Sequence, residues 1–315
     1  MTFSNVFSVE ANTRMSNPIR QHYLAQAGYL RFFTVPDSDR VFQYKRGKRP
    51  VSIGVRDAGL ERHLYSFVDA DGKRNYEIET KVFAPLDGKA SEIMAKLNIG
   101  TGSVSLTETE AQWLLAFIAF QAVRTPAFRD MLLRFDADYL AKSRATNSDL
   151  RAQIRRDFGD VSEDEVEAYC EAVKRKTFEV TNDPRYWLRR MARFVQLIQS
   201  ELAAKSPEIL RSPDEVVITC DHPVVADYDS GFAASDVILP IGSHSILVCH
   251  AAAPWIAVDG GYRIPARCIG GARTRELNLR VMTSAEVFLF AAVAHDRIAQ
   301  RFERSPRPRR MHLPD

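Results

Sequence analysis

The segment Trp113–Phe120 places the strongest constraint on the fold, because it is apolar on every side. Thr107 and Glu110 before it have the spacing of a capping box, which predicts that a helix begins there. The helix should end at Arg124-Thr125-Pro126, since the residue before a proline is disfavoured in the helical conformation. A helix without a polar face has to be covered on all sides, so the sequence predicts a central, buried helix.

The composition is consistent with a core large enough to cover such a helix. Of the 315 residues, 45% are hydrophobic and 26% are charged, which is typical of a globular protein and excludes a disordered, collagen-like or small disulfide-bonded chain. With 43 lysines and arginines against 40 acidic residues, the net charge is only +3. This charge is too small to predict nucleic-acid binding by itself.

Targeting and redox features favour a cytoplasmic protein. The longest apolar stretches, residues 246–258 and 287–294, are shorter than the ~20 residues that span a bilayer, so we expect no membrane partner. The N-terminal segment lacks the apolar core of a signal peptide. The four cysteines are far apart and form no C-x-x-C pair, so neither disulfides nor a zinc ribbon is predicted. The oligomeric state stays open.

The pattern of apolar residues predicts an α+β fold with a predominantly helical core, a small antiparallel N-terminal sheet and a C-terminal strand-rich portion. The expected strands are residues 30–35, 41–44, 51–55, 63–68, 215–220, 237–241, 245–250 and 287–293. The expected helices are residues 77–98, 107–124, 127–142, 147–158, 162–178, 184–204, 273–285 and 296–303.

The same pattern predicts how the chain is organised. Residues 1–19 form an N-terminal extension, and residues 20–300 form a single α+β domain with a subdivision near 205–213 as an alternative. Residues 301–315 form a basic tail that should be disordered until bound, because Pro306 and Pro308 prevent a regular helix.

Glu79 is the first residue that stands out chemically. It is spaced with Phe83, Leu86 and Ile93 on the apolar stripe of its helix, where an unpaired charge would cost several kcal/mol. Asp87 lies beside the same stripe and is a second candidate carboxylate. Two readings stay open for Glu79, a structural salt bridge to Arg124 and a catalytic or metal-binding carboxylate.

Gln121 and Arg124 form the polar end of the apolar helix, so two hydrogen-bonding side chains leave the core together. The Arg124 guanidinium would suit a carboxylate or a phosphate held by two hydrogen bonds. It would equally well complement the negative end of its own helix.

Asp221 and His222 follow an apolar run that reads as a core strand. A strand end is a suitable place for site residues, because the strand fixes them and the loop exposes them. The alternative is that Asp221 only caps the backbone of the loop. His22, which precedes the first expected strand, would be either a packing residue or a site residue.

Two charged segments are candidate surfaces. Arg185, Arg189 and Arg193 are four residues apart and form a basic ridge on a predicted helix. Residues 157–171 contain seven acidic side chains and no basic one, which we interpret as a solvated helical face rather than a metal site. None of the common signatures of hydrolases, zinc proteases, P-loop proteins or dinucleotide-binding proteins is present.

Five segments in a fixed order resemble the prokaryotic domain-of-unknown-function family numbered 4238. They are HYLAQAGYLRFF, YSF with IETKVF, LAFIAFQAVRTPAFR, VVITCDHPVV with LPIGSHSIL, and ELNLRVMTSAEVFLFA. The similarity covers about residues 20–300.

The resemblance implies that the family's polar positions correspond to His22, Glu79, Gln121, Arg124 and Asp221, and that Asn278 matches the asparagine of its last helix. His222 stands where the family usually has asparagine, so any role of that amide is in doubt. The resemblance implies no established reaction.

The leading hypothesis is a metal-dependent phosphodiesterase or nuclease with a role in bacterial toxicity or phage defence. Glu79, Asp87 and Asp221 would hold Mg²⁺ or Mn²⁺, and His22 would act as a base or ligand. Arg124 would stabilise the phosphate, and the arginine ridge would bind nucleic acid. The alternative is a non-catalytic module that binds a ligand or partner and whose buried polar cluster is structural.

Overall fold

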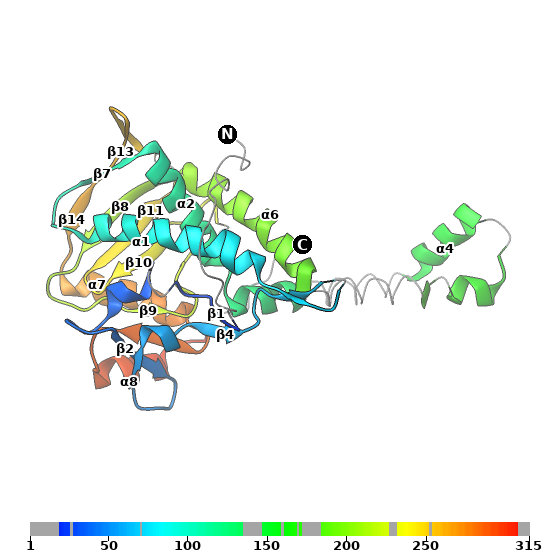
Figure 1. Cartoon of the computed structure of the whole chain (residues 1–315), viewed down its shortest axis with the longest axis horizontal. Coiled ribbons are helices and arrows are strands. Elements are labelled where there is room, and N and C mark those ends of the chain that lie inside the picture. The colour runs from blue at the N-terminus through cyan, green and yellow to red at the C-terminus, as the bar shows by residue number, and fades with distance from the viewer. Residues whose placement is uncertain are drawn as a thin grey trace.

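The computed structural model describes residues 19–25, 28–69, 71–134, 147–158, 161–168, 170–171, 184–226, 232–251 and 254–307 (Figure 1). It confirms the α+β fold class, with several small sheets around a helical core. The α-helices whose two ends lie in the described residues are α1 (Ala84–Asn98), α2 (Glu108–Val123), α4 (Asn147–Phe158), α6 (Pro184–Ala203), α7 (Gly271–Ser284) and α8 (Asp296–Arg304).

Helix α2 is the central element that its sequence predicts. Its capping box is present, because the Thr107 backbone N–H donates to Glu110 Oε2 at 2.8 Å and the Glu110 N–H donates to Thr107 Oγ1 at 3.2 Å. Almost all side chains from Ala111 to Val123 are buried, between α1 on one side and α6 on another. The absence of a polar face is therefore explained by cover from both helices and from the sheets.

The helix expected over residues 77–98 has two parts. Residues Ile78–Phe83 form a π-helical turn, and α1 continues from Ala84 to Asn98. The predicted apolar stripe is confirmed, since Phe83, Leu86 and Ile93 are buried. Wide π turns of this kind are uncommon and occur often at functional sites, and this one carries Glu79.

Two four-stranded sheets contain most of the strands. One has the order β10 (Val237–Gly242), β11 (Ser245–His250), β8 (Ser206–Arg211) and β14 (Ala266–Cys268), with β14 parallel to β8. The other has the order β3 (Val51–Gly54), β2 (Arg40–Lys45), β15 (Phe288–Ala291) and β9 (Thr219–Cys220). The N-terminal strands thus share a sheet with C-terminal strands.

Three smaller groups of strands complete the described part of the chain. A three-stranded sheet joins β12 (Ile256–Val258), β13 (Gly261–Ile264) and β7 (Val104–Thr107). Two hydrogen-bonded pairs are β1 (Arg20–His22) with β4 (Leu60–Arg62), and β5 (Phe67–Val68) with β6 (Arg74–Asn75).

Some expected strands are wrong. Leu30–Phe33 form a 3-10 helix, in which the period of three buries Leu30 and Phe33 together. Of the expected strand over residues 63–68, only Phe67–Val68 is a strand.

The expected strand over residues 215–220 is also shorter, since only Thr219–Cys220 pair with a neighbour. The preceding residues instead bond to the Asn278 side chain, which accepts from the Ile218 N–H and donates to the Val216 carbonyl. The strands that the sequence does not predict are β8, which contains Pro207, and the short strands β1, β4, β6, β7 and β12–β14.

The segment between α2 and α6 is described only in part. Residues 126–134 and 163–168 are helical as expected, while the remainder of the predicted helices over 127–142 and 162–178 lies partly outside the described residues. The N-terminal extension is outside them up to residue 18.

The expected disorder of the basic tail is wrong for its first residues. Arg301–Arg304 belong to α8, and Ser305 is buried, with its carbonyl accepting a 2.8 Å hydrogen bond from Arg46 Nη1. Residues 308–315 lie outside the described residues. Among the helices that are described, none is long and apolar enough to cross a membrane.

Candidate functional site

Arg124 is the centre of a polar cluster, and its side chain is completely buried. Its Nε donates to the Tyr23 carbonyl at 3.1 Å, and Nη1 donates to Asp87 Oδ1 at 2.8 Å. Nη2 donates to Gln121 Oε1 at 2.8 Å. All three nitrogens thus bind groups of the protein itself, and one of these groups is the Asp87 carboxylate. The phosphate contact stays a prediction.

Neighbouring groups hold this arrangement in place. Gln121 Nε2 also donates to the Tyr23 carbonyl at 2.7 Å, and the Tyr65 hydroxyl donates to the Arg124 carbonyl at 2.5 Å. The guanidinium carbon lies 5.3 Å from the centre of the Phe83 ring. The end of α2, the first turn of α1 and the segment just after β1 are therefore tied together by one buried network.

Glu79 differs from Arg124 because part of its hydrogen-bonding capacity is unused. Its Oε2 atom is buried and has no hydrogen-bond partner among the described residues. Burial raises the pKa of this carboxyl to about 7, and the charge of Asp87 adds to the rise, while Arg124 and a hydrogen bond from the His22 backbone oppose it. A carboxyl group with such a pKa can both give and take a proton near neutral pH.

His22 and Asp87 lie next to Glu79 at the half-exposed end of the cluster. The His22 Nε2 lies 3.2 Å from the Arg56 carbonyl, which fixes a tautomer with the proton on Nε2 and a lone pair on Nδ1. Burial lowers the pKa of His22, so the ring is neutral at pH 7. Burial also raises the pKa of Asp87, although the Arg124 partner lowers it.

Asp221 is buried, and its carboxylate is occupied by the backbone. Oδ1 accepts the Glu286 N–H at 2.9 Å, and Oδ2 accepts the Val287 and Phe288 N–H groups at 2.7 and 2.9 Å. Burial nevertheless raises the pKa of Asp221 to about 6. Asp221 therefore caps the backbone of a loop, as one of the two sequence interpretations predicts. The loop that it caps contains residues 286–288, however, and is not its own.

His222 and Asn278 also have contacts within the fold. The His222 Nδ1 lies 3.0 Å from Thr125 Oγ1, and complete burial lowers the pKa of the ring to about 4. Asn278 holds the segment before β9 in place through the two hydrogen bonds described above. Both side chains thus stabilise the region around Asp221.

The structure brings together five of the predicted residues, which are His22, Glu79, Asp87, Gln121 and Arg124. Asp221 is close to the same region, since its charge acts on Tyr23, but its carboxylate bonds to residues 286–288. In the described residues, no group of three or more His, Cys, Asp or Glu side chains is arranged to hold a metal ion. Binding of Mg²⁺ or Mn²⁺ stays a prediction.

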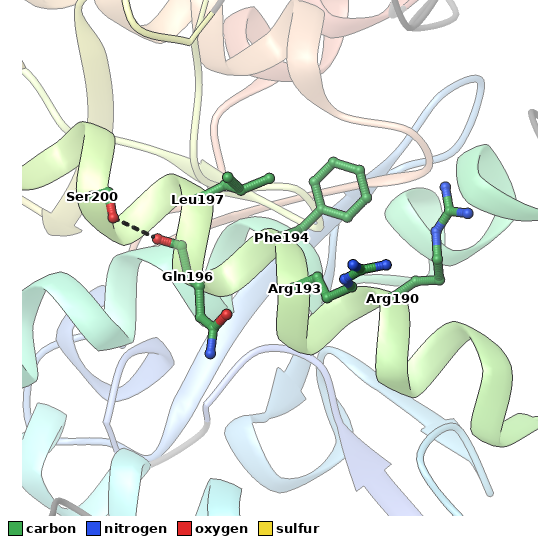
Figure 2. Close-up of a pocket in the computed structure, with 6 residues that line it drawn as sticks. All are labelled: Arg190, Arg193, Phe194, Gln196, Leu197 and Ser200. Carbon is green, nitrogen blue, oxygen red and sulfur yellow. Dashed lines mark hydrogen bonds between the residues drawn. The ribbon is translucent and has the colours of Figure 1, made fainter. Parts of the chain in front are cut away.

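The arginine ridge lies on a separate surface of α6. Arg193 and Arg190 line a groove of about 560 Å³ together with Phe194 and Leu197 (Figure 2). Arg189 is on the same helix outside that lining, and the side chain of Arg185 is outside the described residues. None of the five clustered residues lines this groove.

Sequence reasoning missed four groups in and around the cluster. Tyr65 belongs to the segment YSF, which supported the resemblance, but nothing indicated that its hydroxyl binds the end of α2. Gln21 accepts a 2.6 Å hydrogen bond from the Tyr65 N–H, and Thr125 binds His222. The Tyr23 carbonyl is a backbone group, so no residue pattern could have marked it.

Comparison with known families identifies the chain. Residues 20–291 match the family described as "Protein of unknown function (DUF4238)". The chain belongs to the DUF4238 family. The match spans α1, α2, the π turn and both large sheets, so this DUF4238 member has its entire polar cluster inside the family region. No curated protein and no solved structure matches the chain.

Proposed function

We propose that this DUF4238 member is a hydrolase in which Glu79 is the general acid–base group. The observation that carries the proposal is the buried Oε2 of Glu79, which has no hydrogen-bond partner in the part of the chain that the structure describes, on a carboxyl whose pKa is raised to about 7. Buried polar atoms are nearly always hydrogen-bonded in proteins, so an unpaired one beside other ionisable groups is a candidate for catalysis.

The neighbours of Glu79 have suitable supporting roles. Burial raises the Glu79 pKa, the negative charge of Asp87 adds to the rise, and Arg124 donates to Asp87 Oδ1 at 2.8 Å. His22 is neutral and has a lone pair on Nδ1, so it is available to accept a hydrogen bond from substrate or water. Glu79 would remove a proton from the attacking water and later return it to the leaving group.

A phosphodiester is the substrate class that we favour, with a nuclease acting in bacterial defence as its specific form. The support is indirect, because Arg124 is already saturated by the protein. It consists of the exposed arginine Arg193 and its neighbours on α6, which would bind a phosphate backbone without regard to sequence.

A second candidate is a non-catalytic module in which the cluster only holds the fold. The specific observation in its favour is that Arg124 and Asp221 use their hydrogen-bonding groups on the protein itself. Buried networks of this kind often fix one arrangement of a core without any chemistry.

The test compares Glu79→Gln with Glu77→Gln. Glu77 is an exposed glutamate two residues away that pairs with Lys81, so its change controls for the loss of one carboxylate in the same turn. Hydrolysis of single-stranded RNA, double-stranded DNA and bis(p-nitrophenyl) phosphate is measured with Mg²⁺, with Mn²⁺ and with EDTA.

We expect Glu79→Gln to lose at least about 100-fold in rate, the usual size of an acid–base contribution, and Glu77→Gln to keep the rate. A folded Glu79→Gln protein with full activity, or a wild type without activity on any of these substrates, would contradict the hydrolase. Activity that EDTA abolishes would favour the metal-dependent form.

A further inference from the structure

A group of basic side chains lies where the turn after β2 meets α8. The turn, residues 45–50, has the sequence Lys-Arg-Gly-Lys-Arg-Pro and contains no acidic residue. Residues 296–307 contain four arginines and two acidic residues, Asp296 and Glu303. We define the basic surface as the exposed cations of these two segments, which are Lys45, Lys48, Arg49, Arg297, Arg301, Arg304 and Arg307.

Two sets of contacts join the turn to α8. At the start of the helix, the Tyr44 hydroxyl accepts a hydrogen bond from the His295 N–H at 2.9 Å. At its end, Arg46 Nη1 donates to the Ser305 carbonyl at 2.8 Å, and the guanidinium carbon lies 4.1 Å from the centre of the Phe302 ring. The turn and the helix therefore belong to one surface, and Figure 1 shows α8 beside β2.

Three arginines share one face of α8. Arg297, Arg301 and Arg304 have the spacing i, i+4 and i+7, which places them on the same side of a helix. Ile298 and Phe302 lie on another side and pack against the hydrophobic core. The apolar side therefore anchors the helix, and the arginine face is exposed to solvent.

The charge of the basic surface is not neutralised by the part of the chain that the structure describes. None of its seven side chains forms an ion pair or a hydrogen bond with a described residue, whereas other exposed arginines do, as Arg275 does with Glu215. Burial lowers the pKa of Arg46, and the charge of Arg307 lowers it further, while Asp221 opposes both. Like charges are thus concentrated here, and an anionic partner would relieve their repulsion.

The geometry of the surface favours a nucleic-acid strand as this partner. Neighbouring arginines on one helix face are about 5–6 Å apart, and a strand carries a phosphate about every 3.4 Å, so one strand can reach all three arginines of α8. The guanidinium group also matches the geometry of phosphate. Neither residues 45–50 nor α8 exposes a large apolar side chain, which a membrane-inserting helix or the core of a protein interface would need.

We propose that the basic surface binds the phosphate backbone of single-stranded nucleic acid without regard to sequence. The arginine face of α8 contacts successive phosphates, and Lys48 and Arg49 continue the contact onto the turn. Arg46 joins the two segments and is a positioning residue. The inference rests on the proposed function for its substrate class, and it places the binding of that substrate on elements other than α6.

The test is the binding of a fluorescein-labelled single-stranded RNA of about 20 nucleotides to the full chain, measured by fluorescence anisotropy in EDTA over a series of salt concentrations. One variant removes the arginine face through Arg297→Gln, Arg301→Gln and Arg304→Gln. We expect its Kd to rise at least about tenfold. The slope of log K against log salt should become shallower by about two, because each contact with a single strand contributes about 0.7.

A matched control removes three positive charges from exposed arginines that pair with carboxylates, through Arg267→Gln, Arg273→Gln and Arg275→Gln. It should keep the wild-type slope, since the net charge changes equally but no phosphate contact is lost. A second variant, Lys48→Gln with Arg49→Gln, lies in an exposed turn outside α8 and should also weaken binding, so the test does not depend on the folding of α8.

Three results would overturn the proposal. They are a wild type that does not bind the RNA at about 50 mM salt, equal slopes for the arginine-face variant and its control, and tighter binding to phosphatidylserine vesicles than to RNA at the same salt concentration. The last result would assign the surface to an anionic membrane. Binding does not require hydrolysis, so a protein that binds RNA through this surface but cleaves nothing would refute only the hydrolase.

Discussion

Asp221 and Glu79 are two buried carboxyl groups with raised pKa values, about 6 and about 7, and they differ in what surrounds them. Asp221 accepts three backbone N–H groups from residues 286–288. Glu79 has a buried Oε2 without a partner among the described residues and lies beside a neutral histidine. A raised pKa alone therefore does not distinguish a structural carboxyl from a reactive one, whereas unused hydrogen-bonding capacity does.

The largest effect that we expect is on stability, from Asp221→Ala. This change leaves three buried N–H groups without an acceptor, which should cost about 3–5 kcal/mol in the free energy of unfolding. Urea denaturation measures the loss. Asp214→Ala, at a nearby exposed aspartate, is the control and should stay within about 0.5 kcal/mol of wild type. An Asp221→Ala protein of wild-type stability would show that Asp221 is not the structural carboxyl that its three hydrogen bonds indicate.

The second largest effect that we expect is on the pH dependence of stability, which the substitution Glu79→Gln should change. The folded pKa of Glu79 is raised from 4.5 to about 7, so the folded state binds the proton more tightly, and stability falls as pH rises through this window. The substitution should remove about 1–3 kcal/mol of this fall, because Gln cannot ionise.

Other groups titrate in the same range, but they are the same in all three proteins. Asp221 acts in the same direction as Glu79 up to a pH of about 6, whereas His222, with its pKa lowered from 6.5 to about 4, and His22, with its pKa also lowered from 6.5, act in the opposite direction. The change in the free energy of unfolding between pH 6.5 and 7.5 should therefore be the same for wild type and Glu77→Gln, and more positive for Glu79→Gln. An equal change in all three proteins would show that Glu79 ionises normally.

A smaller effect is expected from Thr125→Val, on the side of Asp221 and His222. This substitution keeps the shape of the side chain and removes the hydroxyl that lies 3.0 Å from His222 Nδ1. The loss should be about 1 kcal/mol, the usual net value of one hydrogen bond, and catalytic rates should not change. A loss of activity at constant stability would instead place His222 in the reaction.

The smallest effect is a shift in the titration of Glu79. Asp87→Asn keeps an acceptor for Arg124 but removes a negative charge that raises the Glu79 pKa. The midpoint of the pH–rate profile should then move to lower pH by a fraction of a unit. The direction is decisive, since an upward shift or an unchanged midpoint would mean that another group controls the rate.

The sequence by itself determined the features that depend on neighbours along the chain. The capping box at Thr107 and the apolar character of α2 predicted a central helix, and the apolar stripe through Phe83 and Leu86 predicted the buried side of the next one. The cost of burying a charge also singled out Glu79, and Arg124, which one reading named as its partner, lies close enough to lower its pKa.

Only the tertiary structure decided what each of these groups binds. Asp221 and Glu79 look alike in the sequence, because hydrogen bonds to the backbone of residues 286–288 come from a loop more than sixty positions away. Arg124 looked free to bind a phosphate because its partners, the Tyr23 carbonyl and Asp87, come from two other segments. Spacing along a chain determines which residues share a face, while the packing of distant segments determines which polar atoms remain unpaired.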